Sequence, residues 1–221
     1  KPYFYYFLFS GFSYDSYFYK QRNLSLPMRK LILFVSLFLV FIVSFLIDKP
    51  ISLFFSSLRT QSLNSIMLFL SKIGNFYSAL IILIVVLISF ELSKKDKKYI
   101  PTIFFSLLVS SLLVYLLKNI FQRQRPYETF PIQGLEQKSD FSFPSGHANA
   151  VFSLVPFMNI HFKKLKWFWL VFSILVAISR IYLGSHYLSD VIFSIITGLG
   201  FSYFFISLER KFKLSRIFIK K

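Results

Sequence analysis

Long apolar stretches alternate with short polar ones along this chain of 221 residues. A helix needs about 20 mostly apolar residues to cross the hydrocarbon core of a bilayer. The uncharged runs that approach this length are residues 31–47, 73–90, 99–117, 147–162, 167–179 and 187–208, the last interrupted only by Asp190. The pattern predicts an all-α, polytopic membrane protein with six transmembrane helices, and an even number of spans places both ends of the chain on one side.

Two further segments are apolar but are too short or too interrupted to span. Residues 51–72 show the spacing of short amphipathic helices, which predicts interfacial helices on the outer surface. Residues 1–30 are rich in Phe and Tyr, and Asp15 interrupts them, so we expect an interfacial segment on the inner leaflet. The sequence contains no internal repeat or linker, so residues 1–221 are expected to form a single domain.

Composition supports membrane insertion and excludes several chemistries. Hydrophobic residues make up 55% of the chain and charged residues 16%, with a mean hydropathy of +0.60. Soluble domains usually carry about 25% charged residues. The chain has no cysteine, which excludes disulfides, thiolate zinc sites and cysteine nucleophiles.

The net charge of +17 would suggest nucleic-acid binding in a soluble protein, but its distribution predicts membrane topology instead. Of the 26 Lys and Arg residues, 18 fall on one side of the six expected spans, in residues 1–30, 94–98, 163–166 and 210–221. Basic residues concentrate on the cytoplasmic side. We therefore expect a multi-pass protein of a bacterial inner membrane, with both termini in the cytoplasm and no nucleic-acid partner.

The remaining polar residues gather where expected spans meet water on the opposite side. The first cluster includes Lys118 and Arg125, seven residues apart, so a continuing helix would place both on one face. Pro126 disfavours helix at Arg125, which predicts that the helix ends there and that the guanidinium turns inward. Ordinary basic residues at a membrane edge are the alternative interpretation.

The second cluster, residues 143–147, opens the fourth expected span. Ser145 is a good N-cap, and Gly146 permits close approach of a ligand to the backbone. The free N–H groups of a helix N-terminus bind anions readily, and His147 would lie in that first turn. A plain capped helix with an incidental histidine is the alternative.

The third cluster joins the last two expected spans and contains Arg180. Gly184 is typical of a helix end, and Ser185 is predicted to be the N-cap of the next helix. His186 and Asp190 would then lie one turn apart, within hydrogen-bonding reach. A carboxylate on one ring nitrogen raises the basicity of the other, although a purely structural His–Asp pair has the same pattern.

Together the clusters supply three cations, two histidines, a carboxylate and two helix N-termini, which suit a tetrahedral oxyanion. Their spacings, Lys-x6-Arg-Pro (118–126), Pro-Ser-Gly-His (144–147) and Ser-Arg-x5-His-x3-Asp (179–190), resemble the three signature motifs of the type 2 phosphatidic acid phosphatase family.

That resemblance implies a role for each motif residue. His186 would attack phosphorus, Asp190 would orient it, and His147 would protonate the leaving oxygen. The phosphate would be bound by Lys118, Arg125, Ser145, Gly146 and Arg180. The resemblance implies neither a metal ion nor another cofactor.

We therefore expect a metal-independent membrane phosphatase that hydrolyses a lipid phosphate or diphosphate through a phosphohistidine on the periplasmic face. Undecaprenyl diphosphate, lipid A 1-phosphate, phosphatidylglycerol phosphate and phosphatidate all remain candidate substrates. A lipid phosphotransferase would use the same residues, and an anion transporter would use the same cations without covalent chemistry. The oligomeric state stays open.

Charged residues outside the motif positions receive ordinary interpretations. Four charged residues of the long outer loop are expected to be solvated, and contact with a lipid headgroup is the alternative. They are Glu128, Glu136, Lys138 and Asp140. Arg123 is an additional candidate for headgroup contact.

Overall fold

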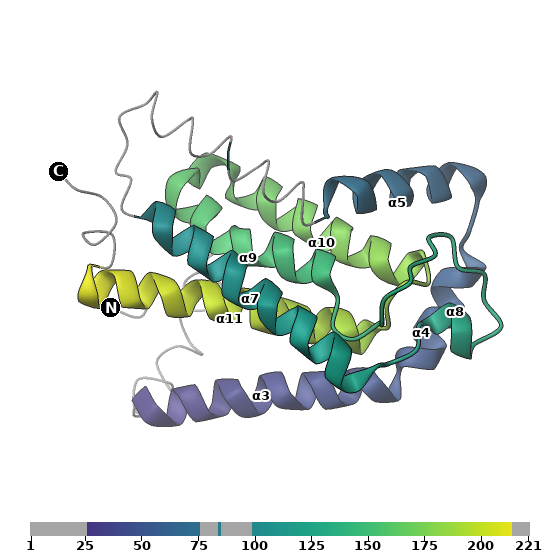
Figure 1. Ribbon diagram of the computed structural model, residues 1–221, viewed down its shortest axis with the longest axis horizontal. Helices are drawn as coiled ribbons and strands as arrows, with labels where there is room; N and C mark the ends of the chain where they lie inside the picture. Colours follow the sequence, from purple (N-terminus) through teal and green to yellow (C-terminus); the bar gives the residue numbers. More distant parts are fainter. Residues whose placement is uncertain (1–25, 76–83, 85–98, 214–221) are drawn as a thin grey trace, which may run out of the picture. The chain divides into compact units, whose positions relative to one another are not determined.

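The computed structural model describes residues 26–75, 84 and 99–213, and within these ranges every regular element is helical. The elements are α3 (Leu26–Leu46), α4 (Asp48–Ser57), α5 (Gln61–Ile73), α7 (Ile100–Phe121), α8 (Pro126–Thr129), α9 (Gly146–His161), the 3-10 helix η2 (Lys163–Leu165), α10 (Lys166–Tyr182) and α11 (Leu188–Phe212) (Figure 1). The all-α prediction is confirmed.

Four of the described helices, α3, α7, α10 and α11, are long and apolar enough to cross a membrane. Helix α9 has 16 residues and falls short of a full span. Most of the second expected span, residues 73–90, lies outside the described residues, as does nearly all of the segment 1–30. The protein is therefore a helical membrane protein, and the number of six spans stays a prediction.

The amphipathic pattern of residues 51–72 does form two short helices, as predicted. Helix α4 begins three residues earlier than the pattern, at Asp48. Helix α5 begins after Thr60, whose hydroxyl accepts a hydrogen bond from the Leu63 amide at 3.3 Å. This side-chain cap satisfies one of the amides that a helix start leaves without a partner.

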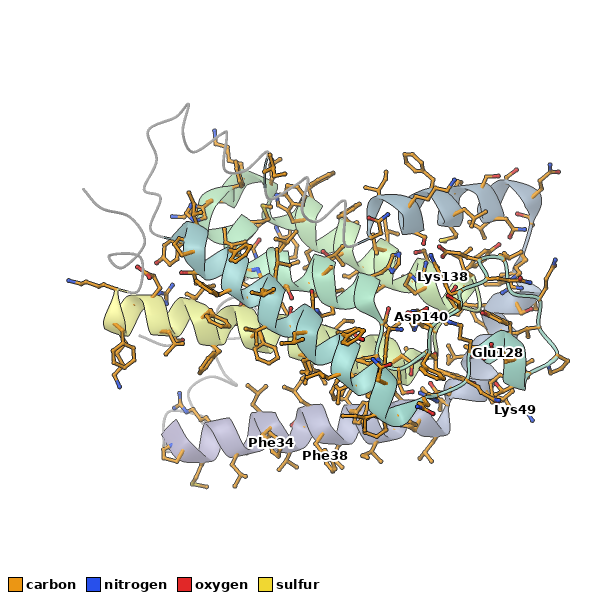
Figure 2. The ribbon with its side chains drawn as sticks, viewed as in Figure 1. Phe34, Phe38, Lys49, Glu128, Lys138 and Asp140 are labelled. Carbon is orange, nitrogen blue, oxygen red and sulfur yellow. The ribbon has the colours of Figure 1, made fainter. Side chains whose placement is uncertain are left out.

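The chain divides into two compact units, residues 1–39 and 40–221. In the first, the described part of α3 exposes most of its apolar side chains, and Phe34 and Phe38 stack one turn apart with ring centroids at 6.5 Å (Figure 2). A helix that is apolar on all sides suits a lipid environment rather than water.

The core of the second unit is built around α9, which packs against α7, α10 and α11 (Figure 1). Its residues from Ala148 to Met158 are buried. Helix α11 approaches it closely at Gly198, where an added Cβ would lie 2.8 Å from the Asn149 carbonyl oxygen. Small residues and short polar side chains at helix contacts are characteristic of packing within a bilayer.

Buried serines connect α7, α9 and α11 through side-chain hydrogen bonds. The hydroxyls of Ser106 and Ser202 lie 3.0 Å apart, and those of Ser110 and Ser153 lie 3.2 Å apart. The Asn149 amide donates to Ser110 at 3.1 Å. Because helix contacts in a bilayer lack a hydrophobic driving force, such bonds help to fix the register in which α7, α9 and α11 meet.

Candidate active site at the helix ends

The turn after α10 brings the third motif back toward its own helix. Gly184 has a φ of +74°, a conformation that residues with a Cβ rarely adopt, and the amides of Ser185 and His186 both donate to the Arg180 carbonyl oxygen, at 3.2 and 3.1 Å. This pattern of bonds past the helix end is typical of a glycine-terminated helix. The prediction that Gly184 ends the helix is confirmed.

The start of α11 differs from its prediction. The N-cap is Tyr187 rather than Ser185, and His186 lies just before the helix rather than in its first turn. The reason is the Asp190 carboxylate, which accepts a hydrogen bond from the Tyr187 amide at 2.9 Å and thereby fixes the helix start at Leu188. The Ser185 hydroxyl donates instead to the Glu136 carbonyl oxygen at 3.3 Å.

The first motif also differs in backbone path. Helix α7 ends at Phe121, with Gln122 in the left-handed conformation, so the expected continuous helix from Lys118 to Arg125 is wrong. Arg125 is extended, with φ −82° and ψ 156°, in agreement with the restriction imposed by Pro126. Both side chains nevertheless reach the same carboxylate, because Asp140 lies 3.0 Å from Lys118 and 2.5 Å from Arg125.

The Arg125 guanidinium turns inward as predicted. Its side chain is 2% exposed and donates to the Ser185 carbonyl oxygen at 2.6 Å and to that of Asp140 at 2.9 Å. These bonds connect the first motif to the third, across 60 positions of sequence.

Arg180, the cation of the third motif, is also buried. One of its terminal nitrogens donates to the Ser71 hydroxyl and to the Glu136 carboxylate. Among the described residues, its other terminal nitrogen and Nε are buried without a hydrogen-bond partner. Buried polar atoms nearly always have partners, so these two donors call for an explanation.

The loop carboxylates do not have the fully solvated positions that the sequence suggested. Partial burial disfavours ionisation of Glu136, but Arg180 and Lys138 outweigh it and hold its pKa at about 2. Asp140 is likewise partly buried, and Lys118 and Arg125 hold its pKa below the usual value. Both groups are therefore anions, and each is paired with at least one motif cation.

The second motif begins α9 as predicted. Ser145 is its N-cap residue, and His147 follows in the first turn with its side chain partly exposed. The Ser145 amide donates to the Asp190 carbonyl oxygen at 3.4 Å, so the starts of α9 and α11 are adjacent. The Ser145 hydroxyl caps no amide, and it is buried without a partner in the part of the chain that the structure describes.

His186 and Asp190 approach each other, but the expected hydrogen bond is not formed. His186 Nδ1 lies 3.6 Å from Asp190 Oδ2 and has no hydrogen-bond partner within residues 26–75, 84 and 99–213. Burial lowers the pKa of His186 well below its ordinary value, and Arg125 and Lys118 add to the effect. The imidazole is therefore neutral and retains a lone pair for attack on an electrophile.

The Asp190 carboxylate is occupied by other donors. Arg123 donates to Oδ1 at 2.5 Å, and the Ser142 hydroxyl donates to Oδ2. Arg123 also pairs with Asp48 at 2.7 Å and lies 3.8 Å from the Tyr187 ring centroid. Arg123, whose side chain is 24% exposed, thus pairs with two carboxylates, and its contact with a headgroup stays a prediction.

Asp48 is a carboxylate beside the site that the sequence analysis did not single out. Besides its pair with Arg123, it accepts hydrogen bonds from the amide and hydroxyl of Ser189, at 2.9 and 2.5 Å. The available signal was a carboxylate at the end of an apolar run, where a charge needs a partner.

The arrangement combines three groups suited to phosphate chemistry. Cationic donors lie near the ends of helices, polar atoms of Ser145 and Arg180 lack partners among the described residues, and a neutral imidazole lies beside a carboxylate. Such a set can bind a tetrahedral oxyanion and attack its central atom. Fold and site together define a helical membrane protein that handles phosphate groups.

Comparison with known proteins identifies the family. The model of the PAP2 superfamily matches residues 101–213, and the chain belongs to this superfamily. An undecaprenyl-diphosphatase of Sulfolobus acidocaldarius is 29% identical over 164 residues, covering 72% of this chain and 77% of the relative. An undecaprenyl-diphosphatase of Bacillus subtilis is 30% identical over 145 residues, covering 64% and 74%.

A solved structure agrees with this assignment. The crystal structure of a transmembrane PAP2-type phosphatidylglycerolphosphate phosphatase from Bacillus subtilis aligns with a TM-score of 0.66 at 28% identity, covering 80% of this chain and 96% of the other. The resemblance inferred from the motifs is confirmed, and so is the class of enzyme, a membrane-bound hydrolase of lipid phosphates.

Proposed function

We propose that this protein removes phosphate from a lipid phosphate or diphosphate through a phosphohistidine on His186, on the periplasmic face of a bacterial inner membrane. The observation that carries the proposal is that, among the described residues, the Ser145 hydroxyl and two guanidinium nitrogens of Arg180 are buried without partners beside the motif cations. Leaving such atoms unpaired destabilises a fold by about 1–3 kcal/mol each, and an oxyanion would pair with them.

The first half of the reaction forms a bond between His186 and phosphorus. Nδ1 faces Asp190, so the other ring nitrogen, Nε2, attacks. Burial and the neighbouring cations, Arg180 first, hold the pKa of His147 at about 3, so a bound phosphate dianion must raise that pKa for His147 to become protonated. The bond from phosphorus to the lipid oxygen then breaks, and His147 gives that oxygen a proton. As Nε2 bonds to phosphorus the ring becomes cationic, and we expect the 3.6 Å separation from Asp190 to shorten to a hydrogen bond.

In the second half, water attacks the phosphohistidine. His147, now neutral, accepts a proton from the water, the bond between nitrogen and phosphorus breaks, and orthophosphate leaves. Lys118, Arg125 and Arg180 stabilise the charge that develops on the phosphoryl oxygens in both steps. Asp190 stabilises the cationic imidazole.

Two of the relatives carry the name undecaprenyl-diphosphatase, which makes an isoprenoid diphosphate the first substrate to examine. Lipid A 1-phosphate, phosphatidylglycerol phosphate and phosphatidate complete the panel. Purified protein should release orthophosphate from at least one of these lipids. The formation of a phosphorylated second lipid without orthophosphate would identify a phosphotransferase instead.

Variants of the two histidines test the assignment of roles. Replacing His186 with Gln should abolish turnover and the acid-labile phosphoenzyme trapped by rapid quenching. Replacing His147 should slow lipid phosphomonoesters most and an aryl phosphate least, because an acidic leaving group needs no proton. The matched control is His161→Asn at the other end of α9, which should leave turnover unchanged. Trapping of phosphoenzyme in the absence of His186 would overturn the mechanism.

A further inference from the structure

Every cation assigned to phosphate binding is already paired with a carboxylate of the protein itself. Asp140 pairs with Lys118 at 3.0 Å and with Arg125 at 2.5 Å, and Glu136 pairs with Arg180. Both carboxylates belong to the segment 130–145 between α8 and α9, which contains neither helix nor strand (Figure 2).

We propose that Glu136 and Asp140 compete with substrate for the phosphate-binding cations, so that a ligand must displace them and terminal phosphate groups are selected over phosphodiesters. The inference rests on the proposed function, because it takes Lys118, Arg125 and Arg180 to be the phosphate ligands. It adds a source of specificity that lies outside the three motifs.

Each cation also has a contact that does not involve these two carboxylate groups, and for Lys118 this is a hydrogen bond to the Phe141 carbonyl oxygen. Arg125 is held by backbone carbonyl oxygens of Ser185 and Asp140, at 2.6 and 2.9 Å, and Arg180 is also bonded to the Ser71 hydroxyl. The Arg125 and Arg180 side chains are 2% and 1% exposed, so packing restrains them as well. Positioning therefore does not account for the two carboxylates.

The carboxylates, in contrast, are more exposed than Arg125 and Arg180. The Asp140 side chain is 54% exposed and that of Glu136 is 20% exposed. Glu136 has a second partner in Lys138, at 2.8 Å, whose side chain is 38% exposed. A carboxylate that moves off Arg180 can therefore retain one ion pair near the surface, which lowers the cost of displacement.

Displacement of two anions discriminates by charge. A terminal phosphate can carry two negative charges and has three oxygens free for hydrogen bonds, whereas a phosphodiester carries one charge and has two such oxygens. The phosphodiester headgroups of a membrane are abundant, and unpaired cations at its surface would bind them without selection. Competition from Glu136 and Asp140 lowers the affinity for every ligand. The affinity for singly charged ligands, which is lower from the start, becomes too low for binding.

Calorimetry on the purified full-length protein in detergent tests the proposal, with orthophosphate and dimethyl phosphate as probes at a pH at which orthophosphate is mostly dianionic. Glu136→Gln and Asp140→Asn keep the shape and hydrogen-bonding capacity of each side chain and remove its charge. We expect each substitution to tighten orthophosphate binding by about 3- to 10-fold. Dimethyl phosphate is relieved of the same displacement cost, so its binding should tighten by a similar factor and become detectable in the variants.

The matched control is Glu128→Gln, which removes the same charge from the same part of the chain. Glu128 accepts a hydrogen bond from the Arg125 backbone amide at 2.7 Å. We expect its substitution to leave the affinity for both probes unchanged. An equal gain in this variant would mean that net charge, and not competition at the cations, controls binding.

Weaker or unchanged orthophosphate binding in both Glu136→Gln and Asp140→Asn would overturn the proposal and assign the carboxylates a positioning role. Circular dichroism verifies that each variant is folded, and the exposed Asp140 provides a test that does not depend on a buried substitution. Phosphate release from the lipid panel separates the two hypotheses. Release by the unaltered protein, with no tightening in the variants, refutes this inference alone, whereas a protein that neither releases nor binds phosphate refutes the proposed function as well.

Discussion

Arg123 joins two carboxylates from distant parts of the chain, and its replacement by Gln is the most demanding test of the charge arrangement. The guanidinium lies 2.7 Å from Asp48 in α4 and 2.5 Å from Asp190 in α11. The two carboxylate side chains are 6% and 0% exposed. Gln cannot supply a positive charge, so both anions would remain buried without a counterion.

The expected loss is large because one substitution strands two charges. Removing one partner of a buried ion pair typically destabilises a protein by about 3–5 kcal/mol. Asp48 keeps its two bonds from Ser189, and Asp190 keeps those from Ser142 and the Tyr187 amide, so each carboxylate retains some stabilisation. We therefore expect a loss of about 3–5 kcal/mol in total, rather than for each carboxylate.

Thermal unfolding in detergent, combined with a double-mutant cycle, measures this loss. For a chain of this length the melting temperature should fall by roughly 6–20 °C in Arg123→Gln. Arg123→Lys, which keeps the charge, should lose less. Asp48→Asn should rescue part of the loss when combined with Arg123→Gln, because it removes one stranded anion. Strict additivity of Arg123→Gln and Asp48→Asn, or equal losses in the Gln and Lys variants, would refute the reasoning.

Four further predictions concern topology, the turn after α10, acid stability and metal ions. A cysteine near Gln133 should react with an impermeant thiol reagent from the periplasmic side and one near Lys97 should not; the reverse pattern would contradict the orientation. Gly184→Ala forces a φ of +74° on a residue with a Cβ and should cost about 1–2 kcal/mol by thermal unfolding, whereas Gly200→Ala, which meets nothing within 4 Å, should be neutral or stabilising. The pKa of Glu136 is lowered from 4.5 to about 2 by folding, so the ionised Glu136 stabilises the fold above pH 4.5 and this stabilisation is lost as the pH falls toward about 2. Glu136→Gln should therefore lose less stability than the unaltered protein between those two pH values. Phosphatase activity should survive a chelator, because the carboxylates described around the site are each paired with Arg or Lys; loss in chelator with recovery in magnesium would contradict this.

The parts of the site that the sequence predicts correctly depend on local signals. Ser145 begins α9 and Gly184 ends α10, because capping and positive φ are determined within a few residues. The predictions that α7 continues past Phe121 and that Ser185 caps α11 are wrong because other local signals determine those two helix ends. Asp190, at the N3 position of α11, provides the capping carboxylate in place of Ser185. Helix α7 ends at Gln122 in the left-handed conformation, where a glycine would have indicated the helix end in the sequence.

The distant pairings could not be predicted from spacing, since Asp48 and Arg123 lie 75 positions apart and Arg180 and Glu136 lie 44 apart. Proximity between such residues arises only when the helices pack, and a single sequence does not specify which loop carboxylate meets which motif cation. The outer acids therefore looked like ordinary solvated residues.

The requirement for a cation beside Asp190, however, follows from charge alone. A fully buried carboxylate needs a positive partner, and His186 cannot provide one in the resting protein, because burial and the neighbouring cations keep its imidazole neutral. Some Arg or Lys must therefore pair with Asp190, and Arg123 does so. The consequence for the proposed mechanism is that Asp190 already has a cationic partner before the reaction begins. It can then form its hydrogen bond with His186 when phosphorylation makes the imidazole cationic, which is the step at which that bond stabilises the reacting state more than the resting one.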